Sequence, residues 1–322
     1  MTNPVDKFFF PKEDIWPGTN EIPPYIFDDK IKIAIKVALI TRRPLLVSGS
    51  PGSGKTTLAK AIAEHQRCSY LNYTFTSRSR LEDLTGEIDQ LQRLHDAHIV
   101  AATGEPIMED WCYYKPGLFW WGFNPDNAVR RGGNKNEVEK LGKRFRTPSK
   151  PKYLKEPSTG AVILLDEIDK AEPDLPNDLL EPLDTLSFQL PGIETIKAQH
   201  DWYLVIITTN GERELPPAFL RRCITLDLPD PESKALVNIA EHHFKTTDAN
   251  NKKLLSTLAG KFKSISDEAS NEQRRRPGTS EYLDAVKACL ELDIVPDDKN
   301  KVWQQIAQST LRKFPQTNER KS

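Results

Sequence analysis

The stretch PLLVSGSPGSGKTT, residues 44–57, carries an apolar run that leads into a glycine-rich loop. The loop fits the phosphate-loop pattern G-x-x-x-x-G-K-[ST] at Gly49, Ser50, Pro51, Gly52, Ser53, Gly54, Lys55 and Thr56. Glycines free backbone N–H groups to converge on phosphates, the Lys55 ammonium reaches the outer phosphates, and the Thr56 hydroxyl ligates Mg²⁺. The pattern predicts a nucleoside triphosphate site and a helix that begins at the loop, includes Thr57 and turns its positive dipole end toward the phosphates.

Composition is typical of an ordinary globular protein. The 322 residues, 38% of them hydrophobic, have room for one large core and a smaller one, so two domains are expected. The 45 basic and 46 acidic residues balance, which gives no overall signal for a nucleic acid or an anionic membrane as partner. No apolar run is long enough to span a membrane and the N-terminus lacks a secretory pattern, so a cytoplasmic protein is expected. The four scattered cysteines fit reduced buried thiols better than a disulfide or zinc framework.

Four more segments are expected to be strands. Residues 161–165 and 203–207 are continuous apolar runs, typical of strands buried on both faces of a parallel sheet, and residues 223–226 form a weaker run. Residues 69–73 are rich in side chains that suit a pleated surface. Helical patterns fall between these segments, so the sequence predicts an α/β fold with a mainly parallel sheet of five strands.

Domain organisation follows from where the strand signals stop. Beyond residue 229 apolar residues recur at helical spacing, so we expect a nucleotide-binding domain over residues 1–229 and a small all-helical domain over residues 230–322. The first twenty or so residues carry several prolines and are expected to form an irregular strap. Residues 130–155 hold ten basic and two acidic residues. Two interpretations of this insert stay open: a mobile solvated loop, which we favour, or a patch that contacts a nucleic acid or an acidic partner.

Polar residues follow two of the apolar runs. Asp166 and Glu167 come directly after residues 161–165. A carboxylate at the C-terminal end of a parallel strand can hold Mg²⁺, and its neighbour can polarise an attacking water. We assign Asp166 to the metal, through its water shell, and Glu167 to the general base. Asn210 follows the next run, where its amide can orient the water or sense the terminal phosphate; an ordinary turn cap is the alternative.

Two arginines, Arg221 and Arg222, form a further candidate site. An arginine supplied by a neighbouring subunit can stabilise the negative charge that develops on a phosphoryl group during hydrolysis. The alternative is a surface pair that makes weak salt bridges, and the residues alone leave the two alternatives equal.

The order of these motifs resembles a known family. GSPGSGKT (49–56), VILLDEIDKA (162–171), ITTN (207–210) and LPPAFLRRC (215–223) resemble the AAA+ ATPases, most closely the MoxR-like branch, over about residues 25–290. The resemblance implies a P-loop NTPase domain of three αβα layers, a helical lid domain, and a homo-hexameric ring with ATP sites between subunits. In family terms the residues are Walker A (Lys55, Thr56), Walker B (Asp166, Glu167), sensor 1 (Asn210) and the arginine finger (Arg222, with Arg221 as an extra candidate).

The resemblance extends to the segments between the motifs. Residues 25–39 resemble the family's first helix, residues 104–123 the insert in helix 2 and residues 188–202 a hairpin before sensor 1. Tyr25 and Ile26 are expected to offer an apolar wall that suits either purine, so the choice between ATP and GTP stays open.

One departure concerns the lid, because no arginine stands where sensor 2 is usual. Arg276, or Arg275, is expected to reach the phosphates from just before the lid helix, unless the role is lost. For the aromatic residues within 119–123 we favour core packing over a pore loop.

Three functions remain open at this stage. The leading one is a MoxR-like ATPase that hydrolyses ATP with Mg²⁺ in a ring and remodels a protein client, chaperone-like, with a von Willebrand factor A-domain partner. The alternative is a motor NTPase subunit of a nucleic-acid-directed bacterial defence complex, similar to the McrB-type GTPases, which only the basic insert supports. A third is a scaffold that binds nucleotide without hydrolysing it. Glu167 argues against that function, because binding alone needs no base there.

Overall fold

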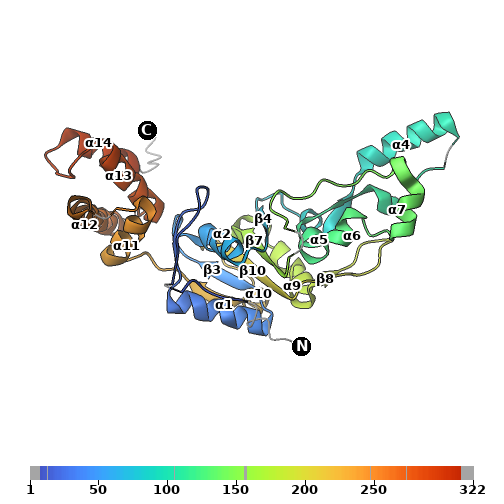
Figure 1. Ribbon diagram of the computed structural model, residues 1–322, viewed down its shortest axis with the longest axis horizontal. Coiled ribbons are helices and arrows are strands. Elements are labelled where there is room, and N and C mark those ends of the chain that lie inside the picture. Colours follow the sequence, from blue (N-terminus) through green and yellow to red (C-terminus); the bar gives the residue numbers. More distant parts are fainter. Residues whose placement is uncertain are drawn as a thin grey trace, which may run out of the picture. The chain divides into compact units, whose positions relative to one another are not determined.

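The computed structural model describes residues 8–12, 14–104, 106–155, 158–246, 248–272 and 274–312. The chain divides into two compact units, and Figure 1 labels some of their elements. The first unit contains residues 28–48 and 62–226 with the residues before position 11. The second contains residues 11–27, 49–61 and everything from residue 227 on.

The first unit is built on a five-stranded sheet. Its strands are β3 (Leu45–Ser48), β4 (Ser69–Thr74), β7 (Gly160–Asp166), β10 (Trp202–Thr209) and β11 (Ile224–Asp227), in the order β11-β3-β10-β7-β4. Strand β10 pairs in parallel with both β3 and β7, and β4 pairs in parallel with β7. All five predicted strands and the mainly parallel α/β fold are therefore confirmed.

Burial explains why the central strands read as unbroken apolar runs. Residues 161–165 are fully buried, and so are Ile206 and Ile207 of β10. Helix α1 (Asp29–Thr41) packs against β3 and β10, and α5 (Leu118–Phe123) packs against β4. With both faces covered there is no solvent side to demand alternating polar residues.

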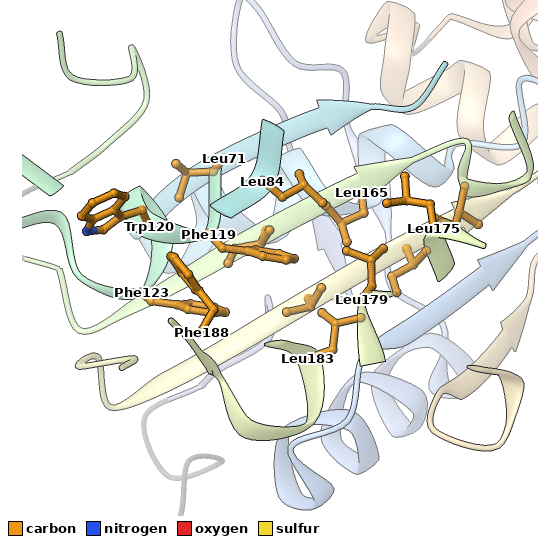
Figure 2. Close-up of a cluster of buried hydrophobic side chains, with 14 of the residues drawn as sticks. Leu71, Leu84, Phe119, Trp120, Phe123, Leu165, Leu175, Leu179, Leu183 and Phe188 are labelled. Atoms are coloured by element: carbon orange, nitrogen blue, oxygen red, sulfur yellow. The ribbon is translucent and has the colours of Figure 1, made fainter. Parts of the chain in front are cut away.

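The aromatic segment belongs to this core. Phe119, Trp120 and Phe123 are completely buried, and Figure 2 shows their rings among aliphatic side chains of the sheet and its neighbouring helices. The Trp120 indole N–H donates to the Asn127 side-chain oxygen at 2.8 Å, which satisfies its one polar group. Core packing, the favoured interpretation, is confirmed, because a ring without exposure cannot project into a pore.

The region between β4 and β7 carries most of the inserted elements. A short antiparallel ladder joins β5 (Gly86–Ile88) to β6 (Tyr114–Pro116). Its other elements are α3 (Leu81–Thr85), α4 (Gln90–Thr103), η2 (Asp110–Tyr113), α6 (Pro125–Val129), α7 (Lys135–Leu141) and η3 (Gly142–Arg144). The segment 104–123, expected to be one insert, therefore supplies a strand of this ladder and ends in the buried helix α5.

The favoured interpretation of residues 130–155 as a mobile solvated loop is wrong in part. Helix α7 lies inside this segment and begins with a capping box between Asn134 and Glu137. Arg131 is buried, its guanidinium lies 5.6 Å from the centre of the Phe145 ring, and burial lowers its pKa. The remaining basic side chains of the insert are mostly exposed.

The last elements of the first unit lie between β7 and β11. They are η4 (Ile168–Lys170), α8 (Leu175–Asp178), α9 (Leu180–Thr185), β8 (Ser187–Phe188), β9 (Ile196–Lys197) and α10 (Pro217–Leu220). Strands β8 and β9 pair in antiparallel fashion, which confirms the hairpin expected over residues 188–202.

The second unit contains a two-stranded ladder, the loop that follows β3, and a group of helices. Strand β1 (Ile15–Trp16) pairs with β2 (Tyr25–Ile26), so the irregular strap holds a small sheet. The helix expected over residues 25–39 begins later, at Asp29, because Asp28 caps it by accepting from the Ile31 N–H at 2.7 Å.

The expected C-terminal helices are confirmed as α11 (Ser233–Phe244), α12 (Ala249–Asn271), α13 (Thr279–Glu291) and α14 (Lys301–Thr310). They share a core that includes Leu255, Phe262, Tyr282 and Trp303. All four cysteines of the chain are free and buried, and burial raises the pKa of Cys68 and Cys223 to about 12. None of the helices in the described part of the chain combines the length and apolar character that crossing a bilayer requires.

Candidate functional site

The phosphate loop follows β3 directly and ends where α2 (Lys55–Gln66) begins. Gly52 and Gly54 have φ of 82° and 92°, a left-handed backbone that glycine adopts without strain. The Lys55 ammonium donates to the Gly49 carbonyl at 2.6 Å and to the Ser50 carbonyl at 3.0 Å, and Lys55 is only 7% exposed. The loop therefore curls around its own lysine, as a loop built to surround a charged group must.

Two other segments of the second unit touch the loop. A β-carbon added at Gly54 would lie 3.4 Å from the Tyr25 ring, so this ring rests on the loop just before α2. Ile26, its neighbour in β2, pairs with Ile15. On the other side the Ser50 hydroxyl donates to the Asp230 carboxylate, and a β-carbon at Gly49 would lie 2.6 Å from the Leu228 carbonyl.

The start of α13 also packs on the loop. A β-carbon at Gly278, the N-cap residue of α13, would lie 2.4 Å from the Pro51 carbonyl oxygen. No residue with a β-carbon therefore fits at position 278 unless the loop moves. A β-carbon at Gly52 would similarly lie 3.0 Å from the Ser280 hydroxyl.

The two arginines before α13 have different partners. Arg275 pairs with Glu281 at 2.8 Å, and Glu281 also accepts from the Gly278 N–H at 2.9 Å. The Arg276 guanidinium lies 3.9 Å from the Asp230 carboxylate and donates to the Ser270 hydroxyl at 2.9 Å. Arg276 is therefore joined, through Asp230, to the loop residue Ser50.

The first unit holds the acidic residues at the C-terminal end of β7. The Thr208 hydroxyl donates to the Asp166 carboxylate at 2.5 Å and accepts from the Glu167 N–H at 2.9 Å, so one buried threonine fixes both residues. Glu167 has φ 60° and ψ 50°, a left-handed conformation that is uncommon for a residue with a side chain. Such strain is often found at functional sites.

The structure brings Glu167 and Asn210 together. The Asn210 side-chain amide donates to one Glu167 carboxylate oxygen at 3.3 Å, and the Lys170 ammonium donates to the other at 2.7 Å. This bond raises the pKa of Lys170. Asn210 therefore contacts the candidate base and does more than cap a turn.

Asp169 is a residue of this site that the sequence interpretation missed. It is 4% exposed, and its Oδ2 accepts from the backbone N–H groups of Asn210 and Glu212, both at 3.0 Å. Its Oδ1 is buried and has no hydrogen-bond partner within the described ranges. The sequence offered one signal for Asp169. This acidic residue stands between Ile168 and Ala171, which are both apolar and buried, so its side chain is not expected to be solvated.

The two candidate finger residues lie on the surface of the first unit. The Arg222 guanidinium pairs with Asp184 at 2.6 Å and approaches the Ala218 carbonyl at 3.4 Å. The Arg221 carbonyl accepts from Arg43 at 3.5 Å. Both side chains are exposed, and a role in a neighbouring subunit stays a prediction.

The chemistry of the predicted metal ligands suits magnesium bound to a nucleotide. In the part of the chain that the structure describes, no cluster of three His, Cys, Asp or Glu side chains could hold a metal ion without help. Mg²⁺ at phosphates needs less, because it keeps several waters and takes one or two carboxylates besides the phosphate oxygens. The Thr56 hydroxyl and the Asp166 carboxylate are oxygen ligands of the required kind.

Comparison with known proteins agrees with these features. A solved structure from Cytophaga hutchinsonii ATCC 33406, described as a "putative ATPase", is similar at 16% identity and a TM-score of 0.40; the match covers 73% of this chain and 57% of that one, and is too distant to support an argument. No curated protein matches. Residues 44–223 match the family AAA domain (dynein-related subfamily), and this segment contains the phosphate loop, the acidic end of β7 and Asn210. Because the match spans more than half of the sequence, the chain belongs to that family of AAA ATPases.

Proposed function

We propose that this protein is a Mg²⁺-dependent ATPase of MoxR-like type that works in an oligomeric ring and uses hydrolysis to remodel a protein client. One observation carries the hydrolytic part. The Glu167 carboxylate, held in a strained turn directly after a buried strand, is bonded to the side chain of Asn210. A protein that only binds nucleotide has no need of that arrangement.

Each part of the chain has a distinct task in this proposal. The amides of the loop and the Lys55 ammonium bind the phosphates, while Tyr25, which rests on the loop, flanks the nucleotide. Thr56 and Asp166 would hold Mg²⁺, which when bound neutralises phosphate charge. Ile26 and Thr57 are assigned to the nucleotide by their neighbours in sequence alone.

The hydrolytic step needs a change at Glu167. Glu167 takes a proton from a water whose oxygen attacks the γ-phosphorus, and the bond from that phosphorus to the bridging oxygen breaks. In the present conformation both Glu167 carboxylate oxygens accept hydrogen bonds, one from Asn210 and one from Lys170. We infer that Lys170 must release the carboxylate before it can act, while Asn210 helps to orient the water.

The test is Glu167→Gln, which keeps the size of the side chain and removes its basicity. Turnover should fall by about 10²- to 10⁴-fold, whereas MgATP affinity should stay close to that of the parent protein. Lys55→Ala is the complementary variant and should lose nucleotide binding itself. Unchanged turnover in Glu167→Gln would show that Glu167 is not the base.

The ring, the client and the von Willebrand factor A-domain partner rest on the resemblance to MoxR-like proteins. In such a ring Arg222 would leave Asp184 and reach the nucleotide of the next subunit, with Arg221 as the second candidate. Sedimentation of Glu167→Gln with and without MgATP tests the assembly, and co-purification of this variant with a co-expressed von Willebrand factor A-domain protein tests the partner.

The defence-complex alternative has one structural observation in its favour. Within residues 130–155 the basic side chains Lys135, Lys140, Lys143 and Lys150 are exposed, and such a surface can bind phosphate backbones. Turnover of ATP and GTP with and without duplex DNA separates the two functions. Strong GTP preference together with stimulation by DNA would favour the McrB-like function.

A further inference from the structure

Asp230 links the phosphate loop to the C-terminal helices in the second unit. It stands between Pro229 and Pro231 in the connector that leads from β11 to α11. Proline fixes its own φ and restricts the residue before it, so the backbone of this connector has little freedom. The backbone from which the Asp230 side chain projects is therefore restricted.

The Asp230 carboxylate has two partners from different segments. Its Oδ1 accepts from the Ser50 hydroxyl, in the phosphate loop, and its Oδ2 lies 3.9 Å from the Arg276 guanidinium. Arg276 has a second anchor, the Ser270 hydroxyl at the end of α12. The guanidinium is thus held from two sides, and only the Asp230 side leads to the loop.

Packing around this carboxylate keeps the loop and Arg276 close. Gly278 is two residues beyond Arg276 and touches the Pro51 carbonyl of the loop. Two residues span at most about 7 Å of chain. The Arg276 backbone therefore lies near the loop, although the Asp230–Arg276 pair is half exposed and weak by itself.

We propose that Asp230 is a positioning residue that directs the Arg276 guanidinium toward the outer phosphate of a nucleotide in the loop. This inference rests on the proposed function and adds a specific consequence to it. Arg276 would contact the third phosphate, which ATP has and ADP lacks, so Asp230 would set how strongly the protein prefers ATP over ADP. Asp230 itself touches no nucleotide.

The experiment compares ATP and ADP affinities in a set of variants by titration with Mg²⁺ present. Arg276→Ala should reduce the ATP-to-ADP affinity ratio by about tenfold or more, the effect of losing one hydrogen bond to a charged group. Asp230→Ala and the nearly isosteric Asp230→Asn should each reduce the ratio by about three- to tenfold, with ADP affinity almost unchanged. Asn keeps an acceptor for Ser50, so similar effects of the two Asp230 variants would identify the lost ion pair with Arg276, and not the lost Ser50 bond, as the cause.

Two further variants complete the design. The double variant Asp230→Ala with Arg276→Ala should show the same ratio as Arg276→Ala alone, because the two residues act as one. Glu268→Gln is the matched control: it breaks another exposed ion pair of the C-terminal helices, with Arg312 at 3.1 Å, and should leave the ratio unchanged. Thermal unfolding of each variant verifies that it is folded.

Three results would overturn the proposal. Equal losses of ATP and ADP affinity in the Asp230 variants would indicate a general structural role, and additive effects in the double variant would show that Asp230 and Arg276 act separately. An unchanged ATP-to-ADP affinity ratio in Arg276→Ala would show that Arg276 does not contact the third phosphate. In each case the parent protein still hydrolyses ATP through Glu167, so the proposed function survives; a parent protein that binds neither nucleotide would defeat both.

Discussion

Asp169→Ala is expected to lower both stability and turnover. Its Oδ2 accepts two backbone N–H groups at 3.0 Å from inside the protein, and hydrogen bonds to charged groups contribute about 1.5–3 kcal/mol each. Burial of a carboxylate whose other oxygen has no hydrogen-bond partner within the described ranges offsets part of this gain. We therefore expect a net loss of about 2–4 kcal/mol in the free energy of unfolding.

The effect on turnover follows from what Asp169 holds. Without it the backbone of Asn210 loses an anchor, and the Asn210 amide is placed less well against Glu167. Misplacement of a reacting group by about 1 Å can cost as much as 10²-fold in rate, so we expect at least a tenfold fall in kcat.

The assay combines urea unfolding, followed by circular dichroism, with steady-state phosphate release. Asp169→Asn keeps one acceptor oxygen and should lose about half as much stability. Asp178→Ala, an exposed aspartate on α8, is the control and should stay within about 0.5 kcal/mol of the parent. If Asp169→Ala unfolds at the same urea concentration as Asp178→Ala, the account of this buried carboxylate is wrong.

Three further predictions concern the core, the thiols and the arginines. Trp120→Ala should cost about 3–5 kcal/mol of unfolding free energy, because the ring is fully buried. A variant as stable as the parent would show that the Trp120 ring is not part of the core. At pH 8 a thiol reagent should label the native chain slowly and should label all four cysteines after denaturation, because burial raises the pKa of Cys112 and Cys289 to about 11. Above the ordinary thiol pKa of 9.0 the unfolded chain loses its thiol protons before the folded chain does. The free energy of unfolding should therefore fall as pH rises from about 9 to 12. Arg222→Ala should reduce turnover by about 10³-fold or more and leave ATP binding intact, and mixed rings with Lys55→Ala subunits should recover activity; no recovery would argue against a residue that acts across the interface.

The sequence was sufficient for the sheet because its strands are buried on both faces. Such strands leave unbroken apolar runs, and 161–165 and 203–207 were predicted to within a few residues of β7 and β10. The ladder between β5 and β6 was not predicted. Its segments are three residues each and lie far apart in the chain, so no periodicity marks them. Helix α7 was missed because charge dominated the interpretation of a segment whose capping residues, Asn134 and Glu137, were present.

The candidate site likewise contains residues that the sequence predicted and residues that it did not. The loop and the acidic strand end were found from motifs, since their chemistry restricts the residue types at each position. Asp169 and Asp230 were not, because their roles depend on which backbone N–H or guanidinium lies opposite them, and that is a property of the fold. The missing lid arginine was noticed in the sequence, whereas the contact of Gly278, the residue before α13, with Pro51 was visible only in the structure.

The left-handed backbone of Glu167 has an evolutionary consequence. This conformation costs a residue with a β-carbon about 1–2 kcal/mol, and glycine adopts it freely. With Glu167 as the proposed base, a descendant with glycine at position 167 would escape this backbone strain and lose turnover of ATP. Selection for solubility or heat resistance alone would therefore favour variants of this chain that do not hydrolyse ATP. A more stable relative need not be an active ATPase.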